Sequence, residues 1–210
     1  MQAALFDGDW RSDYGIDYGD VQWRDTGERL TAESFARYRA QGGVVILHMM
    51  REARVQQALG NDWVIVASDG MPFAPGAHPR TAGTFSRVLG RYVREQCLLD
   101  LPTAIAKMTL LPARRLEPIA PAMAKKGRVQ VGADADLVLF DPARIIDTAT
   151  FESGPRFSEG IQWVFVKGVA VVAEGESVEG KYPGEPVVGR RSLHPKGPAD
   201  RRMAPARALP

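Results

Sequence analysis

Two short apolar runs stand out in the first half of the chain, and each stops abruptly at polar residues. Residues 44–47 are followed by His48, and residues 64–67 are followed by Ser68 and Asp69. A continuous apolar run predicts a strand that is buried on both faces, as in a parallel sheet covered by helices. Helical patterns flank both runs, so we expect βα units whose strands lie parallel in one sheet. Asp69 would then sit at a carboxyl-terminal strand end.

Helix signals occupy the intervening segments. Thr31 is predicted to cap a helix that stops at Gly42, and Asp100 is predicted to cap another, with Pro112 restarting a second piece. Apolar residues with the i, i+3, i+4, i+7, i+8 spacing of an amphipathic helix occur at Phe85, Val88, Leu89, Tyr92 and Val93.

From residue 127 the pattern changes to that of strands. Four strands are predicted, at residues 127–132, 135–140, 163–166 and 169–172. The last two would be joined by a hairpin turn at Lys167 and Gly168, where Asn-Gly is the more usual pair because the turn needs positive φ.

The first thirty residues carry six aspartates among Gly, Tyr and Trp. This composition predicts a long surface loop, either solvated or facing a substrate. A calcium loop is disfavoured because the twelve-residue pattern with its closing Glu is missing.

Composition sets further bounds. With 45% hydrophobic residues in 210, the chain can bury a core without disulfides, and its single cysteine, Cys97, is predicted to be a buried apolar side chain rather than a catalytic thiol. No leader and no apolar run of membrane-spanning length is visible, which predicts a cytoplasmic protein.

The carboxyl-terminal thirty residues differ in composition from the rest. Residues 181–210 hold seven Lys and Arg against two acidic residues, and six of the fifteen prolines. We expect residues 185–210 to form a disordered basic tail without a function of its own, and a nucleic-acid contact is the weaker alternative.

Three polar residues form the candidate site. Asp69 at its strand end is followed, across a Gly/Pro-rich loop, by His78 and Arg80 just before the amphipathic helix. Such a loop brings together a base, a donor and a guanidinium that can bind an anion. His48 ends the other predicted strand and could share that face, although a lone strand-end histidine is more often a hydrogen-bonded structural group.

A family resemblance is carried by these same segments. The series Ala67-Ser-Asp-Gly70, His78-Pro-Arg80, Gly83-Thr-Phe85, Arg87-Val-Leu-Gly90 and Tyr92-Val-Arg-Glu95 resembles the last barrel strand and following segment of N-acyl-D-amino-acid deacylases, or D-aminoacylases, of the amidohydrolase superfamily. The resemblance extends from about Asp9 to about Gly184. It implies an α/β fold in which residues 1–118 are the carboxyl-terminal part of a metal-dependent-hydrolase TIM barrel, with about two βα units, and residues 119–184 are a small β-sandwich segment.

The resemblance also implies a chemistry. The family hydrolyses the amide bond of N-acyl-D-amino acids with zinc. Asp69 would correspond to its general acid/base, with a possible contact to the metal, and Arg80 to the residue that binds the substrate carboxylate. His78 would orient the loop or touch the substrate.

The departures from the family pattern define a second hypothesis. The chain holds three histidines in total and no His-x-His pair, and it has room for only part of a barrel of about 250 residues. We therefore expect it to be inactive alone and completed by an amino-terminal fragment or by a second copy. The alternative is a non-catalytic domain that acts through association, because two strands without neighbours leave open edges.

Overall fold

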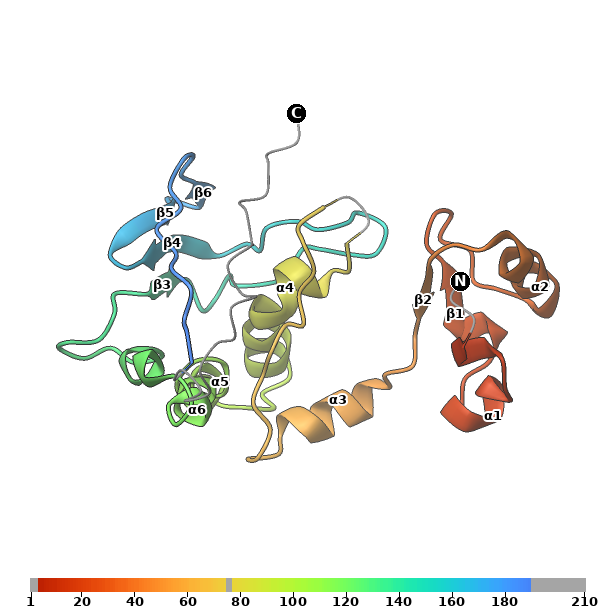
Figure 1. The fold of residues 1–210 in the computed structure, drawn as a ribbon, viewed down its shortest axis with the longest axis horizontal. Helices are drawn as coiled ribbons and strands as arrows, with labels where there is room; N and C mark the ends of the chain where they lie inside the picture. Colours follow the sequence, from red (N-terminus) through yellow and green to blue (C-terminus); the bar gives the residue numbers. More distant parts are fainter. Residues whose placement is uncertain (1–3, 75–76, 190–210) are drawn as a thin grey trace, which may run out of the picture.

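The structure is a computed structural model that describes residues 4–74 and 77–189 (Figure 1). Its buried apolar side chains form two clusters, one in the first fifty residues and one in the remainder. In Figure 1 the amino-terminal elements lie at one end, and the segment with α3 (Glu52–Leu59) leads from them to the helices and sheet of the second part. The candidate residues Asp69, His78 and Arg80 belong to the second part.

The first thirty residues are not the long surface loop that their composition predicts. They contain η1 (Ala4–Phe6), α1 (Trp10–Tyr14), η2 (Tyr18–Asp20) and β1 (Val21–Trp23). The buried side chains of this region are Phe6, Trp10, Ile16, Val21, Trp23 and Leu30. Large aromatic side chains build a core here at irregular spacing, which neither the helix period nor the strand period detects.

The prediction of a parallel sheet is also wrong. β2 (Val45–Leu47) pairs antiparallel with β1, and residues 64–67 form no strand. The second apolar run is extended chain whose Val66 side chain is buried and whose Val66 N–H donates to the carbonyl of Lys107. An apolar run reports burial, but the partner of a strand is decided by tertiary contacts. The helix predicted between Thr31 and Gly42 is confirmed: it is α2 (Ala32–Gln41), with Thr31 as its amino-terminal cap.

Helices make up most of the second core. α4 (Arg80–Arg87) continues into the π-helical η3 (Val88–Glu95), and α5 (Leu101–Met108) begins after its cap Asp100. The predicted second piece is α6 (Leu110–Leu116), followed by the short η4 (Pro121–Lys125). The sequence thus predicted the helices between residues 80 and 116, from an amphipathic spacing, a cap and a proline at a helix start, but it did not predict α3.

The carboxyl-terminal half contains a four-stranded antiparallel sheet in the order β3-β4-β5-β6. Its strands are β3 (Leu137–Phe140), β4 (Ile161–Val166), β5 (Val169–Ala173) and β6 (Glu176–Ser177). Lys167 and Gly168 join β4 to β5 with φ values of 51° and 78°, so a lysine does occupy the turn position where Asn is favoured. β6 was not predicted from the sequence.

The predicted strand at residues 127–132 is absent from the structure. Val129 and Val131 are 89% and 104% exposed, and no ladder partner lies beside them among the described residues. The alternating pattern is present, but no neighbouring strand is there to pair with it.

Two smaller predictions end differently. Cys97 is exposed and has a φ of 51°, because η3 ends just before it, so it is not a buried apolar side chain. The disordered tail was predicted for residues 185–210, of which residues 190–210 lie outside the described part and residues 185–189 have no regular structure. In the part of the chain that the structure describes, none of the helices has the length and apolarity needed to cross a membrane.

The packing of η3 against the segment before residue 147 yields a stability prediction. A Cβ added at Gly90 would lie 2.5 Å from the Ile145 carbonyl oxygen. We expect Gly90→Ala to lower the free energy of unfolding by about 1–3 kcal/mol, despite the better helix propensity of alanine. Urea unfolding followed by tryptophan fluorescence measures this change. Gly19→Ala is the control, because a Cβ there meets nothing within 4 Å, and an equal loss in both variants would contradict the steric explanation.

Candidate functional site

Asp69 and Arg80, eleven residues apart, are in direct contact. The Arg80 Nη2 lies 2.9 Å from Asp69 Oδ2, and Arg80 Nε donates to the Asp69 carbonyl over 2.9 Å. The Asp69 side chain is 86% exposed, and its backbone has a φ of 47°, in the left-handed region that few residues other than glycine adopt. The guanidinium therefore holds both the main chain and the carboxylate of this residue in place.

His78 joins the same group of residues. Its Nδ1 accepts a hydrogen bond from the backbone N–H of Arg80 at 3.1 Å, at the start of α4. Its ring packs edge-on against Phe151, with ring centroids 4.8 Å apart. Burial is the main cause that lowers the pKa of His78, the Arg80 charge lowers it further, and Asp69 opposes them. The structure thus brings together all three predicted site residues.

His48 contacts the same aromatic ring. Its ring centroid lies 5.5 Å from that of Phe151, and its Nε2 is 2.9 Å from the buried Gln22 side-chain oxygen. Burial and the Arg29 charge lower the pKa of His48. Its hydrogen bond to Gln22 agrees with the structural alternative considered for a strand-end histidine.

A cavity of about 400 Å³ lies beside these groups. Its lining residues come from the start of α4 and from the segment around residue 150, and include His78, Arg80, Thr84, Arg87, Asp147 and Phe151. Asp69 does not line this cavity but is tied to its wall through Arg80. The cavity therefore combines the two predicted substrate-binding residues with a charged and aromatic wall.

An ion pair fastens that wall to α4. Arg87 Nη1 lies 3.0 Å from Oδ2 of Asp147, whose side chain is only 10% exposed. The hydrogen bond and charge of Asp147 raise the pKa of Arg87, although burial opposes this. Because Asp147 is four residues from Phe151, the pair helps to fix the segment whose ring contacts both histidines.

The segment that leads to Asp69 is held by a buried lysine. Lys107, on the last turn of α5, is 1% exposed, and its Nζ donates to the carbonyls of Asn61 and Val64. Its own carbonyl accepts from the Val66 N–H at 3.0 Å. These three hydrogen bonds attach residues 61–66 to α5.

The described residues do not supply a metal site. Within residues 4–74 and 77–189, no three His, Cys, Asp or Glu side chains lie close enough together to hold an ion. Zinc in hydrolytic sites takes three protein ligands from such side chains. The donor set present here therefore does not fit a zinc centre by itself.

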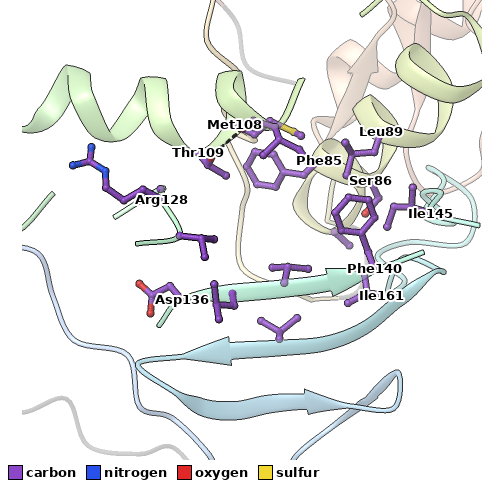
Figure 2. Close-up of a pocket in the computed structure, with 17 residues that line it drawn as sticks. Phe85, Ser86, Leu89, Met108, Thr109, Arg128, Asp136, Phe140, Ile145 and Ile161 are labelled. Atoms are coloured by element: carbon purple, nitrogen blue, oxygen red, sulfur yellow. Dashed lines mark hydrogen bonds between the residues drawn. The ribbon is translucent and has the colours of Figure 1, made fainter. Parts of the chain in front are cut away.

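A larger apolar groove of about 660 Å³ lies on the other side of α4 (Figure 2). Figure 2 shows Phe85 and Leu89 from the helix, Met108 from α5, and Phe140 and Ile161 from the sheet around it. Val129 and Arg128 of the unpaired segment also line it. Arg128 is held by Glu117, so the groove presents mainly apolar surface.

Sequence reasoning missed three residues of this region. Phe151 lies 73 residues from His78, and Asp147 and Lys107 lie 67 and 27 residues from Arg80, so no local motif singles them out. The one signal available was the unusual lysine within the apolar face of a predicted helix, since buried lysines are rare unless they are paired.

Comparison with known proteins shows the family to which the chain belongs. A profile of the amidohydrolase family matches residues 25–178, so the chain belongs to that family. It is 42% identical over 152 residues to the N-acyl-D-aspartate deacylase of Alcaligenes xylosoxydans xylosoxydans, which covers 72% of this chain and 29% of that protein.

Solved structures show the same relationship. A D-aminoacylase with a binuclear metal centre matches with a TM-score of 0.62 and 43% identity, covering 70% of this chain and 29% of that one. The N-acyl-D-glutamate deacylase from Bordetella bronchiseptica, complexed with zinc and a phosphonate inhibitor, matches with a TM-score of 0.64 and 33% identity, over 80% and 38%. The mixed α/β fold is therefore similar to that of D-aminoacylases, and the chain spans about a third of their length.

The depressed histidine pKa values generate a prediction about pH. The unfolded chain binds protons to histidine near pH 6.5, whereas the folded chain resists protonation of His78 and His48, so the free energy of unfolding should fall as the pH drops from 7.5 to 5.5. We expect His78→Asn to show a smaller fall, because asparagine can still accept from the Arg80 N–H but does not titrate.

Urea unfolding at several pH values measures the difference. The carboxylates whose pKa is lowered, such as Asp100, are present in both proteins and so cancel from the comparison. Equal pH dependence in the wild type and in His78→Asn would show that His78 contributes nothing to it.

Proposed function

We propose that this chain is the acid/base and carboxylate-binding part of a hydrolase that acts on the amide bond of N-acyl-D-amino acids. The observation that carries the proposal is the contact of Asp69 with Arg80, with His78 beside them, in a segment that matches N-acyl-D-amino-acid deacylases. The relatives are named as an N-acyl-D-aspartate deacylase, a D-aminoacylase and an N-acyl-D-glutamate deacylase.

Asp69 has the properties of a proton-transfer group. Its carboxylate is exposed, so a water molecule or a leaving nitrogen can reach it, and Arg80 forms an ion pair with it. In amide hydrolysis such a carboxylate accepts a proton from the attacking water on one oxygen. It then returns the proton to the leaving nitrogen, so that the amine departs neutral.

Arg80 is suited to hold the substrate carboxylate. Its Nε and Nη2 bind Asp69, and among the described residues its Nη1 has no hydrogen-bond partner. A guanidinium offers five donors in one plane, so it can bind Asp69 and a substrate carboxylate at once. This would place the α-carboxylate of an N-acyl amino acid close to the proton-transfer group.

His78 and Phe151 would form the wall against which the substrate lies. Burial lowers the pKa of His78, so its imidazole is uncharged at pH 7. It remains able to orient the Arg80 backbone and to touch the substrate within the cavity.

We further propose the division of the chain that its resemblance implies. Residues 1–118 would belong to the carboxyl-terminal part of a TIM barrel, residues 119–184 to a β-sandwich segment, and residues 185–210 to a tail. The four-stranded antiparallel sheet within residues 137–177 supports the second of these units. The described residues hold no cluster of three donors, so most metal ligands of the complete enzyme would come from outside them, and Asp69 would add at most one contact.

The proposal predicts activity by complementation. We would mix the chain with the part of the Alcaligenes N-acyl-D-aspartate deacylase that lies outside the matched segment, add zinc, and measure the release of D-aspartate from N-acetyl-D-aspartate. The chain alone is expected to be inactive, and the mixture active. Asp69→Asn should reduce that activity by about 10²–10⁴-fold, because the proton-transfer step is lost.

Asp62→Asn is the matched control for this variant. It removes an exposed carboxylate from the same segment and should leave the activity unchanged. Full activity of Asp69→Asn in the complemented sample would refute the assignment of Asp69 as general acid/base.

A second candidate function is association without catalysis, and the apolar groove favours it. The groove, the unpaired Val129 and Val131, and the edge strand β3 lie together, and such a surface is prone to add a strand. We propose that its occupant is an amino-terminal portion of the amidohydrolase fold, because about two thirds of the relatives' length has no counterpart in this chain.

Charge on the exposed valines tests this association. We expect Val129→Lys with Val131→Lys to weaken binding of the same deacylase fragment by at least about tenfold, measured by calorimetry, since two valines would lose their burial. Val188→Lys, at another exposed valine, is the control. Unchanged affinity, or dimers of the chain that form equally well without the fragment, would contradict the proposed occupant.

A further inference from the structure

Lys107 is the one charged side chain among the buried residues of the described part. Its Nζ makes hydrogen bonds to the carbonyls of Asn61 and Val64, the latter at 2.9 Å. Burying an ammonium group is costly unless its protons find acceptors. The two carbonyls supply them, and the position of Lys107 in the last turn of α5 adds the favourable carboxyl-terminal end of the helix dipole.

The segment held by Lys107 has little else to fix it. Residues 61–71 form no strand ladder, and apart from the buried Val66 side chain their position depends on contacts at the two ends. At the start are the bonds to Lys107, including Val66 N–H to the Lys107 carbonyl. At the end, Arg80 binds Asp69, and the Met71 N–H donates to the Thr81 hydroxyl at 3.1 Å.

We infer that Lys107 is a positioning residue for Asp69. It touches neither the cavity nor the proposed substrate, and it acts by anchoring the extended chain that carries Asp69 to Arg80. Val64 and Asp69 are five residues apart, about 16 Å of extended chain. Loss of the Lys107 side-chain bonds leaves this stretch attached before Asp69 only through Val66, whose N–H donates to the Lys107 carbonyl and whose side chain is buried. This inference deepens the proposed function and depends on it for its catalytic meaning.

The amine is well matched to this task. A lysine Nζ is a compact donor with three protons on one atom, and so it can serve two carbonyls three residues apart. Methionine has a similar volume but no donor. Lys107→Met therefore keeps a similar side-chain volume and removes the two side-chain bonds. The Val64 carbonyl loses its donor, whereas the Asn61 carbonyl still accepts from the Val64 N–H.

The first test follows the hydrogen bond from Arg80 Nε to the Asp69 carbonyl, with no need for activity. In the ¹⁵N-labelled wild type we expect the Arg80 Nε–H to exchange slowly with solvent. As urea is added, its exchange rate should rise in parallel with that of the Val66 amide. In Lys107→Met this protection should fall by at least about tenfold while amides of α4 and η3 keep theirs.

Leu101→Ala is the matched control, because it loosens the packing of α5 in the same core without touching the segment. It should leave the Arg80 Nε–H protected. Unchanged protection in Lys107→Met, or an equal loss in Leu101→Ala, would overturn the inference. If Lys107→Met does not fold, the wild-type measurement decides, since independent opening of the Val66 amide and the Arg80 Nε–H would also overturn it.

The second test uses the complemented enzyme. There Lys107→Met should lower turnover by about 10²-fold, as expected for a displaced proton-transfer group, and Leu101→Ala should not. An inactive wild-type complex together with the expected exchange result would refute the proposed function and leave the anchoring role supported. Full turnover of Lys107→Met in an active complex would overturn the positioning role alone.

Discussion

A buried ammonium group with only main-chain acceptors is the constraint on which the candidate site depends. Removing a charge from water is unfavourable, so Lys107 is stable in the core only while the carbonyls of Asn61 and Val64 stay beside it. The same requirement holds an extended segment that has no sheet to support it. Asp69 follows that segment and binds Arg80. The burial of Lys107 in the core therefore helps to fix the position of an exposed carboxylate.

The two sides of α4 have different chemistry. One side faces a cavity with His78, Arg80 and Arg87, fastened to the segment around Phe151 by the pair of Arg87 with Asp147. The other side faces an apolar groove closed by the sheet and α5. A single helix thus separates a charged cavity from an apolar groove, and each of the two candidate functions uses one of them.

The sequence predicted local features well and long-range pairing badly. The caps at Thr31 and Asp100 and the hairpin at Lys167 were found because their signals lie within a few residues. The parallel sheet was wrong because an apolar run records burial but not its partner. The strand predicted at residues 127–132 failed for a related reason, since an alternating pattern forms a strand only where another strand lies beside it.

The same division applies to the site. The sequence by itself determined the identity and order of Asp69, His78 and Arg80 and the family to which they point, because these depend on residue types at fixed short spacings. Only the tertiary structure decided that Arg80 binds both the backbone and the carboxylate of Asp69, that Phe151 contacts two histidines, and that Lys107 holds the chain before Asp69. Those contacts join residues far apart in the chain, and their free energy arises from burial and hydrogen bonding that no local pattern records.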